Sequence, residues 1–198
     1  MDAQFWDERY GSRDLLFSGE PNAVLVTEVA GLPPGQALDV GCGEGGDARW
    51  LAGRGWQVTA VDISRVALER AEAVGVPGPG AVAWTRADLT ATAMPAAAFD
   101  LVSVQYFPFP RQPGPRALRG LIDAVAPGGI LLFVGHDPAD LTGHEDIDPT
   151  AFYHPTDIPA LLDSGWVVET SETRLRTGPP PAGTHHTHDV VLRARRGR

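Results

Sequence analysis

The sequence predicts an α/β protein built on a doubly wound sheet of seven strands, mostly parallel, with an antiparallel last strand. Three observations support this fold class. Short apolar runs alternate with amphipathic stretches along most of the chain, which is typical of parallel strands joined by crossover helices. The first run ends in a glycine-rich turn, and the last two runs are joined by an arm with no room for a helix.

Five apolar runs are the expected parallel strands. They are rich in Val, Leu, Ile and aromatic residues and end beside Gly, Asp or Pro, as strands buried on both faces do. These runs span residues 37–40, 56–62, 81–86, 99–106 and 129–135.

Amphipathic segments between these runs are the expected crossover helices, over residues 47–55, 64–75 and 116–129. Ser64 is a suitable N-cap for the second helix, because its hydroxyl can accept a hydrogen bond from the first turn. Pro127 and the two glycines after it close the third helix. A short helix is expected over residues 158–165.

The carboxyl-terminal part predicts two more strands, over residues 166–175 and 188–196. The arm between them, residues 177–186, is too short and too rich in proline to be a crossover helix. Two strands joined without a helix are antiparallel, so the sheet is expected to end in a hairpin.

Composition excludes several classes of function. The net charge of −9 argues against binding to a nucleic-acid backbone, which requires clustered positive charge. All 16 basic residues are arginines, so no lysine can form a Schiff base or bind phosphate. The single cysteine, Cys42, excludes an internal disulfide and a multi-cysteine zinc site. Without an apolar signal core or a membrane-length apolar run, a cytoplasmic protein without a membrane partner is expected, as a monomer or homodimer.

The glycine-rich turn after residue 40 is the most informative segment. Gly41, Gly43, Gly45 and Gly46 follow a strand and precede a helix, and glycines there let the backbone approach a ligand closely. The next strand ends in Asp62, which is placed to accept hydrogen bonds from both hydroxyls of a ribose. The pattern fits a dinucleotide loop as well as an S-adenosylmethionine loop that begins at Asp39.

The charges around the turn favour S-adenosylmethionine. Glu44 and Asp47 lie at the amino end of the following helix, where they would oppose a pyrophosphate. S-adenosylmethionine carries no phosphate and has a positive sulfonium, which acidic neighbours suit. Its ammonium group also needs an acceptor, which Asp39 or a loop carbonyl can supply.

With these motifs in order, the chain resembles the class I S-adenosylmethionine-dependent methyltransferases over nearly its whole length. LDVGCGEGG, VTAVDIS, TRADL, FDLVSVQYF and LIDAVAPGGILLFVG resemble the family's successive motifs, which implies a Rossmann-like fold. Within the superfamily, the size and the amino-terminal FWDERY segment are similar to small tellurite-resistance and thiopurine-type methyltransferases. The resemblance implies one domain, with a helical cap or lid over residues 1–32 and a sheet core over residues 36–198. It implies these cofactor-binding residues: Trp6, Asp39, Gly41, Cys42, Gly43, Gly45, Asp62, Ile63, Ser64, Asp88, Leu89 and Gln105.

Candidate substrate residues follow the fourth and fifth strands, at the carboxyl edge where open α/β sheets bind substrates. His136 and Tyr106 are the candidates for a general base, although a loop that merely connects two elements is an equal alternative. No metal site is expected, because the histidines near residue 186 fit a solvated hairpin better. The full set of substrate candidates is Tyr106, Phe107, Arg111, His136, Asp137 and His154.

We therefore expect an enzyme that transfers a methyl group from S-adenosylmethionine to a small-molecule nucleophile (oxygen, nitrogen, sulfur or a metalloid oxyanion), leaving S-adenosylhomocysteine. Two alternatives from other classes stay open. One is an NAD(P)-dependent oxidoreductase, and the other is a catalytically silent S-adenosylmethionine-binding regulator. A nucleic-acid methyltransferase is a weaker alternative, because the Asn/Asp-Pro-Pro-Tyr/Phe signature is missing and the net charge is wrong.

Overall fold

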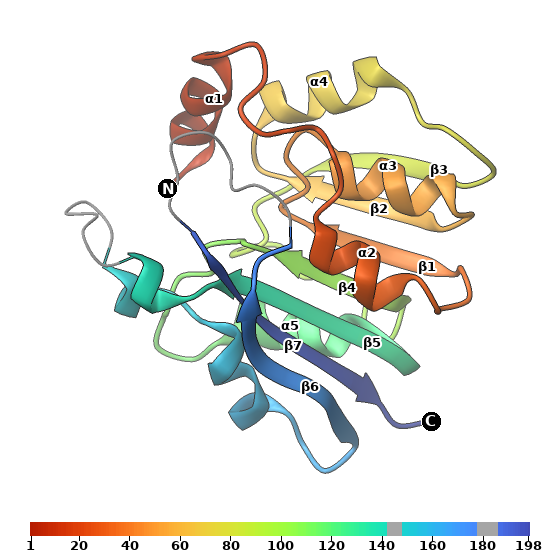
Figure 1. Ribbon diagram of the computed structural model, residues 1–198, viewed down its shortest axis with the longest axis vertical. Coiled ribbons are helices and arrows are strands. Elements are labelled where there is room, and N and C mark those ends of the chain that lie inside the picture. The colour runs from red at the N-terminus through yellow and green to blue at the C-terminus, as the bar shows by residue number, and fades with distance from the viewer. Residues whose placement is uncertain (142–147, 178–185) are drawn as a thin grey trace.

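The computed structural model describes residues 1–141, 148–177 and 186–198, and its centre is a seven-stranded sheet (Figure 1). Neighbouring strands follow the order β3-β2-β1-β4-β5-β7-β6. Their bounds are β1 Gln36–Val40, β2 Gln57–Asp62, β3 Ala81–Arg86, β4 Phe99–Gln105, β5 Val125–His136, β6 Trp166–Leu175 and β7 His188–Arg196.

The strand directions confirm the predicted fold class. β1, β2, β3, β4 and β5 run parallel to one another, whereas β7 is antiparallel to both β5 and β6. The hairpin predicted at the end of the chain is therefore β6–β7, and β7 is inserted between β5 and β6. The chain has the doubly wound, Rossmann-like architecture that its sequence predicts.

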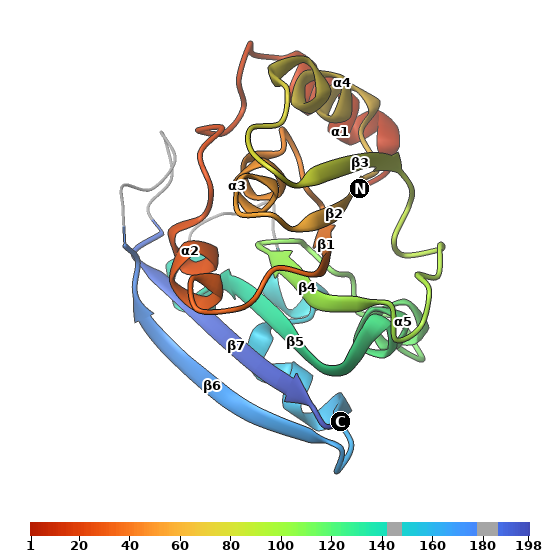
Figure 2. The same cartoon turned by 90° about the vertical axis from the view of Figure 1, so that its right-hand side faces the viewer.

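Helices cover both faces of the sheet (Figure 2). The helical elements are α1 Ala3–Gly11, α2 Ala23–Val29, α3 Gly46–Gly53, α4 Arg65–Val74 and α5 Arg116–Ala124, with 3₁₀ segments η1 Pro138–Leu141, η2 Pro149–Ala151 and η3 Pro155–Leu161. α2 and α3 bury Leu25 and Leu51 against one face, and α5 and η3 bury Leu121 and Ile158 against the other. Burial of these apolar side chains is the main stabilisation of a layered α/β fold.

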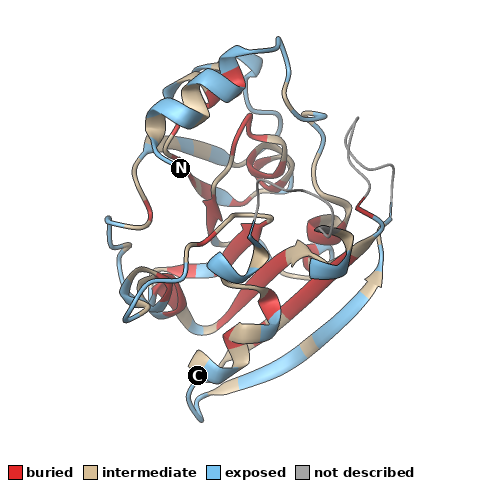
Figure 3. Cartoon of the chain, turned by 90° about the vertical axis from the view of Figure 1, so that its left-hand side faces the viewer, coloured by how far each residue is buried: buried red, intermediate tan, exposed pale blue. Residues whose placement is uncertain are grey.

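Burial is uneven across the sheet (Figure 3). β4 and residues 129–134 of β5 are almost wholly buried, whereas most residues of the edge strand β6 are exposed. Among the described residues, no helix is long and apolar enough to cross a bilayer.

Two predicted boundaries are wrong. The helix expected over residues 116–129 ends at Ala124, because Val125 is extended and Pro127 disfavours helix in the residue before it. β5 therefore starts at Val125, and a register shift against β4 between Phe99 and Leu101 accommodates the extra residues. The helix expected over residues 158–165 is the 3₁₀ segment Pro155–Leu161, which has a proline inside it.

Candidate functional site

The site lies at the carboxyl edge of the parallel strands. The strand order reverses beside β1, which has β2 on one side and β4 on the other. Open α/β sheets bind their ligands at such a switch point, outside the carboxyl ends of the strands. The glycine-rich turn follows β1 at this position.

The turn requires glycine for conformation and for space. Gly41, Gly43 and Gly45 have φ values of 68°, 52° and 79°, a left-handed region that L side chains rarely adopt. A Cβ at these three positions would lie 2.4 Å from Phe107, 2.7 Å from the Tyr10 hydroxyl and 2.5 Å from Trp84. The loop is therefore packed so closely by aromatic side chains that only backbone fits there.

Asp62 connects the turn to the start of α4. Its two carboxylate oxygens accept hydrogen bonds from the amides of Gly43, at 2.9 Å, and Ser64, at 2.8 Å. Burial raises the pKa of the Asp62 carboxyl, and the backbone amides oppose that rise. Ser64 caps α4 by accepting from the amide of Ala67, and its own side chain is fully buried.

A pocket opens beside Asp62 and brings together many predicted cofactor residues. The side chain of Asp88 accepts from the amide of Thr90 at 2.8 Å, which fixes the loop after β3 next to this pocket. The lining includes Trp6, Asp62, Ile63, Asp88, Leu89 and Phe107.

Asp39 carries a buried acceptor that suits a cationic ligand. It is buried at the end of β1, and its Oδ2 has no hydrogen-bond partner among the described residues. Burial raises the pKa of the Asp39 carboxyl well above its usual value, and the nearby carboxylates of Asp47 and Asp62 raise it further. The Oε1 of Gln105 is also buried and unpartnered within the described chain. Orphaned acceptors beside clustered carboxylates suit an ammonium or sulfonium ligand and oppose a pyrophosphate.

The residues present therefore fit S-adenosylmethionine. Gly41, Gly43 and Gly45 place bare backbone in the turn where any side chain would collide with its neighbours, and Asp39 offers an acceptor for an ammonium group. Cys42 lies within the same turn, where burial raises the pKa of its thiol, so the thiol stays protonated.

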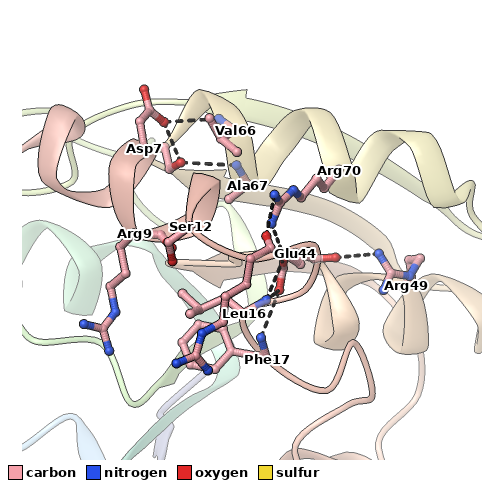
Figure 4. A network of polar contacts seen from close by, with 12 residues as sticks. Asp7, Arg9, Ser12, Leu16, Phe17, Glu44, Arg49, Val66, Ala67 and Arg70 are labelled. Atoms are coloured by element: carbon pink, nitrogen blue, oxygen red, sulfur yellow. Dashed lines mark hydrogen bonds and ion pairs between the residues drawn. The ribbon is translucent and has the colours of Figure 1, made fainter.

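Glu44 and Asp47 have a role that the sequence did not predict, since both bind the amino-terminal segment. Figure 4 shows the contacts of Glu44. The Glu44 carboxylate accepts from the amides of Leu16 and Phe17, at 3.1 to 3.2 Å, and pairs with Arg70 at 3.0 Å. Asp47 accepts from the backbone and the side-chain amide of Asn22, at 2.6 and 2.8 Å. These carboxylates therefore hold the segment that precedes α2 against the glycine-rich turn.

α1 also packs over the turn, and together with the segment that precedes α2 it forms an amino-terminal cover (residues 3–22). Asp7 accepts from the Ser64 hydroxyl at 2.6 Å and from the amide of Val66 at 3.1 Å, so it joins α1 to the start of α4. Tyr10 is 4% exposed and places its hydroxyl against Gly43. Trp6, on the same helix, lines the pocket beside Asp62.

On the opposite side of β1, the structure brings Tyr106 and His136 together. Tyr106 follows β4 with a φ of 53°, and its ring stacks on that of His136 at a centroid distance of 4.5 Å. His136 in turn stacks on His186 at 3.8 Å. Burial and the neighbouring His186 lower the pKa of His136 to about 3, so its imidazole is neutral at physiological pH.

Other predicted substrate residues have structural partners of their own. Arg111 pairs with Asp157 at 2.5 Å, and the amide of His154 donates to the same carboxylate at 2.7 Å. Asp137 accepts from the amide of Ala139 within η1. His185 lies outside the described residues, and no described group of three acidic, His or Cys side chains could hold a metal ion.

Comparison with known proteins agrees with this geometry. Residues 37–129 match a family described as a methyltransferase domain. An uncharacterized methyltransferase of Mycobacterium bovis is 39% identical over 97 residues, which are 49% of this chain and 48% of that protein. Thiopurine S-methyltransferase of Xanthobacter autotrophicus is 35% identical over 74 residues, 35% of each chain. Ribosomal RNA small subunit methyltransferase C of Alcanivorax borkumensis is 51% identical over 52 residues, 25% of this chain and 16% of that protein. The matches thus span about half or less of these relatives.

Solved structures share the fold. A protein studied for the conversion of a disulfide bond into a thioacetal group during echinomycin biosynthesis superposes with a TM-score of 0.74 at 24% identity, over 98% of this chain and 92% of that one. An S-adenosylmethionine-dependent methyltransferase of Mesorhizobium loti superposes with a TM-score of 0.62 at 23% identity, over 82% of this chain and 90% of that one.

Proposed function

We propose that this protein methylates a small-molecule nucleophile in the cytoplasm with S-adenosylmethionine as the methyl donor, because residues 37–129 match a family described as a methyltransferase domain and the chain shares the fold of a solved S-adenosylmethionine-dependent methyltransferase. The observation that carries the proposal is the acidic, glycine-lined turn with the orphaned carboxylate oxygen of Asp39. A nucleic-acid acceptor fits less well, because the chain has a net charge of −9.

The cofactor assignment divides among three groups of residues. Asp62 would accept from the ribose hydroxyls, Asp88 and Leu89 would contact the adenine, and Asp39 would balance the ammonium group. When bound, S-adenosylmethionine supplies a methyl group on a positively charged sulfur that is already a good leaving group. The protein then has to align the acceptor and exclude water, which can supply most of the rate enhancement.

Neither of the two predicted candidates for a general base, His136 and Tyr106, is a strong base. His136 has a pKa of about 3, and the Tyr106 hydroxyl is the donor of a hydrogen bond to Asp189 at 2.8 Å. An alcohol needs its proton removed, whereas a thiol near its pKa presents a nucleophile without help. We therefore propose a thiol, or a comparable soft nucleophile, as the acceptor, which the similarity to a thiopurine S-methyltransferase supports.

Two measurements test the proposal. Calorimetry with S-adenosylhomocysteine and NADH should give binding of the first and none of the second, and the reverse would assign an oxidoreductase. Release of S-adenosylhomocysteine should then be screened with thiophenol, phenol, aniline and tellurite. Turnover of thiophenol above phenol is expected. Tight cofactor binding without turnover of any acceptor would instead favour a catalytically silent regulator.

A further inference from the structure

Tyr106 has an unusual backbone for its position in the sheet. It follows the last residue of β4 with a φ of 53°, a region that bulky side chains rarely enter. Its amide still donates to the carbonyl of Val134 at 2.8 Å, so the strained turn is anchored to β5. Backbone outliers of this kind persist only where surrounding contacts hold them, and they concentrate at functional sites.

The Tyr106 ring is held by groups from three other elements. Its hydroxyl donates to the Oδ1 of Asp189 on β7 at 2.8 Å, and its face stacks on His136 of β5 at 4.5 Å. The guanidinium of Arg176, just after β6, lies 4.9 Å from the ring centroid. These contacts hold the phenol in its observed orientation.

Asp189 is the centre of this arrangement. It is 1% exposed and pairs with His136 in the register of β5 and β7. A buried carboxylate requires a counter-ion and hydrogen bonds, which Arg176, at 3.3 Å from the same oxygen, and the Tyr106 hydroxyl supply. The ion pair between Asp189 and Arg176 thus sets the position of the Tyr106 hydroxyl.

The arrangement borders the cofactor turn. β4 is the neighbour of β1, with Val40 opposite Val104, so Tyr106 follows the strand beside the glycine-rich turn. The next residue, Phe107, contacts Gly41 directly. Tyr106 and His136 therefore lie on the β4–β5 side of the turn, whereas Asp62 and Asp88 lie on the β2–β3 side.

We propose that Asp189, with Arg176 as its counter-ion, is a positioning residue that locks the Tyr106 phenol and the His136 imidazole at the acceptor end of the site. The inference rests on the proposed methyl transfer. Burial keeps both rings neutral, and the phenol proton is directed at Asp189. The two rings then orient an acceptor and do not deprotonate it.

The kinetic test compares Asp189→Asn, Tyr106→Phe and the double variant, with thiophenol as acceptor. Each single variant should lower kcat about 10-fold or more, as expected for loss of a hydrogen bond to a charged group, with KM for S-adenosylmethionine unchanged. The double variant should lose no more than the more impaired single variant, because both changes break the same hydrogen bond. Additive losses in kcat, or a raised KM for the cofactor without a change in kcat, would contradict the proposed positioning role of Asp189.

Tyr106→Phe preserves the ion pair between Asp189 and Arg176, so it keeps the test informative if Asp189→Asn does not fold. The exposed Asp123→Asn on α5 serves as the matched carboxylate-to-amide control and should behave as wild type.

A second readout needs no acceptor. The chain has three tyrosines, so fluorotyrosine labelling gives a simple fluorine NMR spectrum in which Tyr106→Phe identifies the Tyr106 signal. That signal should titrate at a higher pH than free fluorotyrosine, because burial and Asp189 raise the pKa of the phenol. Asp189→Asn should lower the titration midpoint of the Tyr106 signal. An unchanged midpoint in a folded variant would contradict the proposed positioning role of Asp189. Failure of S-adenosylhomocysteine to bind wild type would refute the proposed function separately, since the fluorine titration is independent of it.

Discussion

Gly43→Ala tests whether the amino-terminal cover is closed over the cofactor turn. Gly43 has a φ of 52°, and a Cβ there would lie 2.7 Å from the hydroxyl of Tyr10, which is buried on α1. The substitution therefore strains the turn and also pushes against the cover. Both effects should lower the free energy of unfolding.

The magnitude follows from these two effects. A left-handed alanine costs about 1–2 kcal/mol, and relieving an overlap in a packed site costs about 1–3 kcal/mol. The variant should lose roughly 2–5 kcal/mol, which for a chain of this size lowers Tm by roughly 4–20 °C. Tyr10→Phe removes the clashing oxygen and leaves the Cζ at 3.7 Å, an ordinary contact distance. In the Gly43→Ala background, Tyr10→Phe should therefore restore the part of the unfolding free energy that the overlap removes.

Denaturant unfolding of the two single variants and the double variant measures this coupling, and hydrogen exchange over residues 3–22 reports opening of the cover. Gly120→Ala is the matched control, because Gly120 lies in α5 with no atom within 4 Å of the added methyl group. That variant should be as stable as wild type or more so, by up to about 1 kcal/mol. If Gly43→Ala matched the control, or if Tyr10→Phe restored nothing, Tyr10 would not be packed over the turn.

Three further predictions concern buried titratable groups. Asp62→Ala should weaken S-adenosylhomocysteine binding by roughly 1–3 kcal/mol, the loss of a charged hydrogen-bonding partner, and unchanged affinity in calorimetry would contradict the ribose assignment. Asp39→Asn should raise Tm at neutral pH and weaken the same binding. Because the pKa of Asp39 is raised in the folded protein, its carboxyl makes the free energy of unfolding fall as pH rises above the usual aspartate pKa. A Tm equal to that of wild type would show that the carboxylate has a partner. The pKa of His136 falls from 6.5 to about 3, so its contribution to stability is present above pH 6.5 and is lost as pH falls toward 3, by roughly 3–6 kcal/mol. His136→Phe keeps the stack and should make urea-unfolding stability less dependent on pH in that window, and an unaltered dependence would argue against the buried neutral imidazole.

The parts of the fold that the sequence predicts well depend on local rules. Gly41, Gly43 and Gly45 mark the turn after β1, because each needs a positive φ, and the proline-rich arm after β6 predicts the antiparallel pair. The predicted start of β5 was wrong because Gly128 and Gly129 resemble the end of a helix. The shifted register against β4 that absorbs them is a tertiary contact.

The same distinction between local patterns and tertiary contacts explains why only part of the site was predicted. Asp62 and Asp88 follow predicted strands, and the structure places both at one pocket. The contact between Tyr106 and Asp189 joins residues 83 positions apart, and no local pattern encodes such a pair. Glu44 was interpreted only through its charge, since its partners, the backbone amides of Leu16 and Phe17, leave no side-chain signature in the sequence.

The insertion of β7 between β5 and β6 has a consequence for biosynthesis. The last strand of the chain pairs along β5 from Ile130 to His136, so a nascent chain carries β5 with one unpaired side until residue 196 has left the ribosome. Unpaired strand edges attract other chains. A stop codon between residues 175 and 188 would remove β7 altogether and therefore expose the interior of the sheet along β5, and not merely shorten a tail.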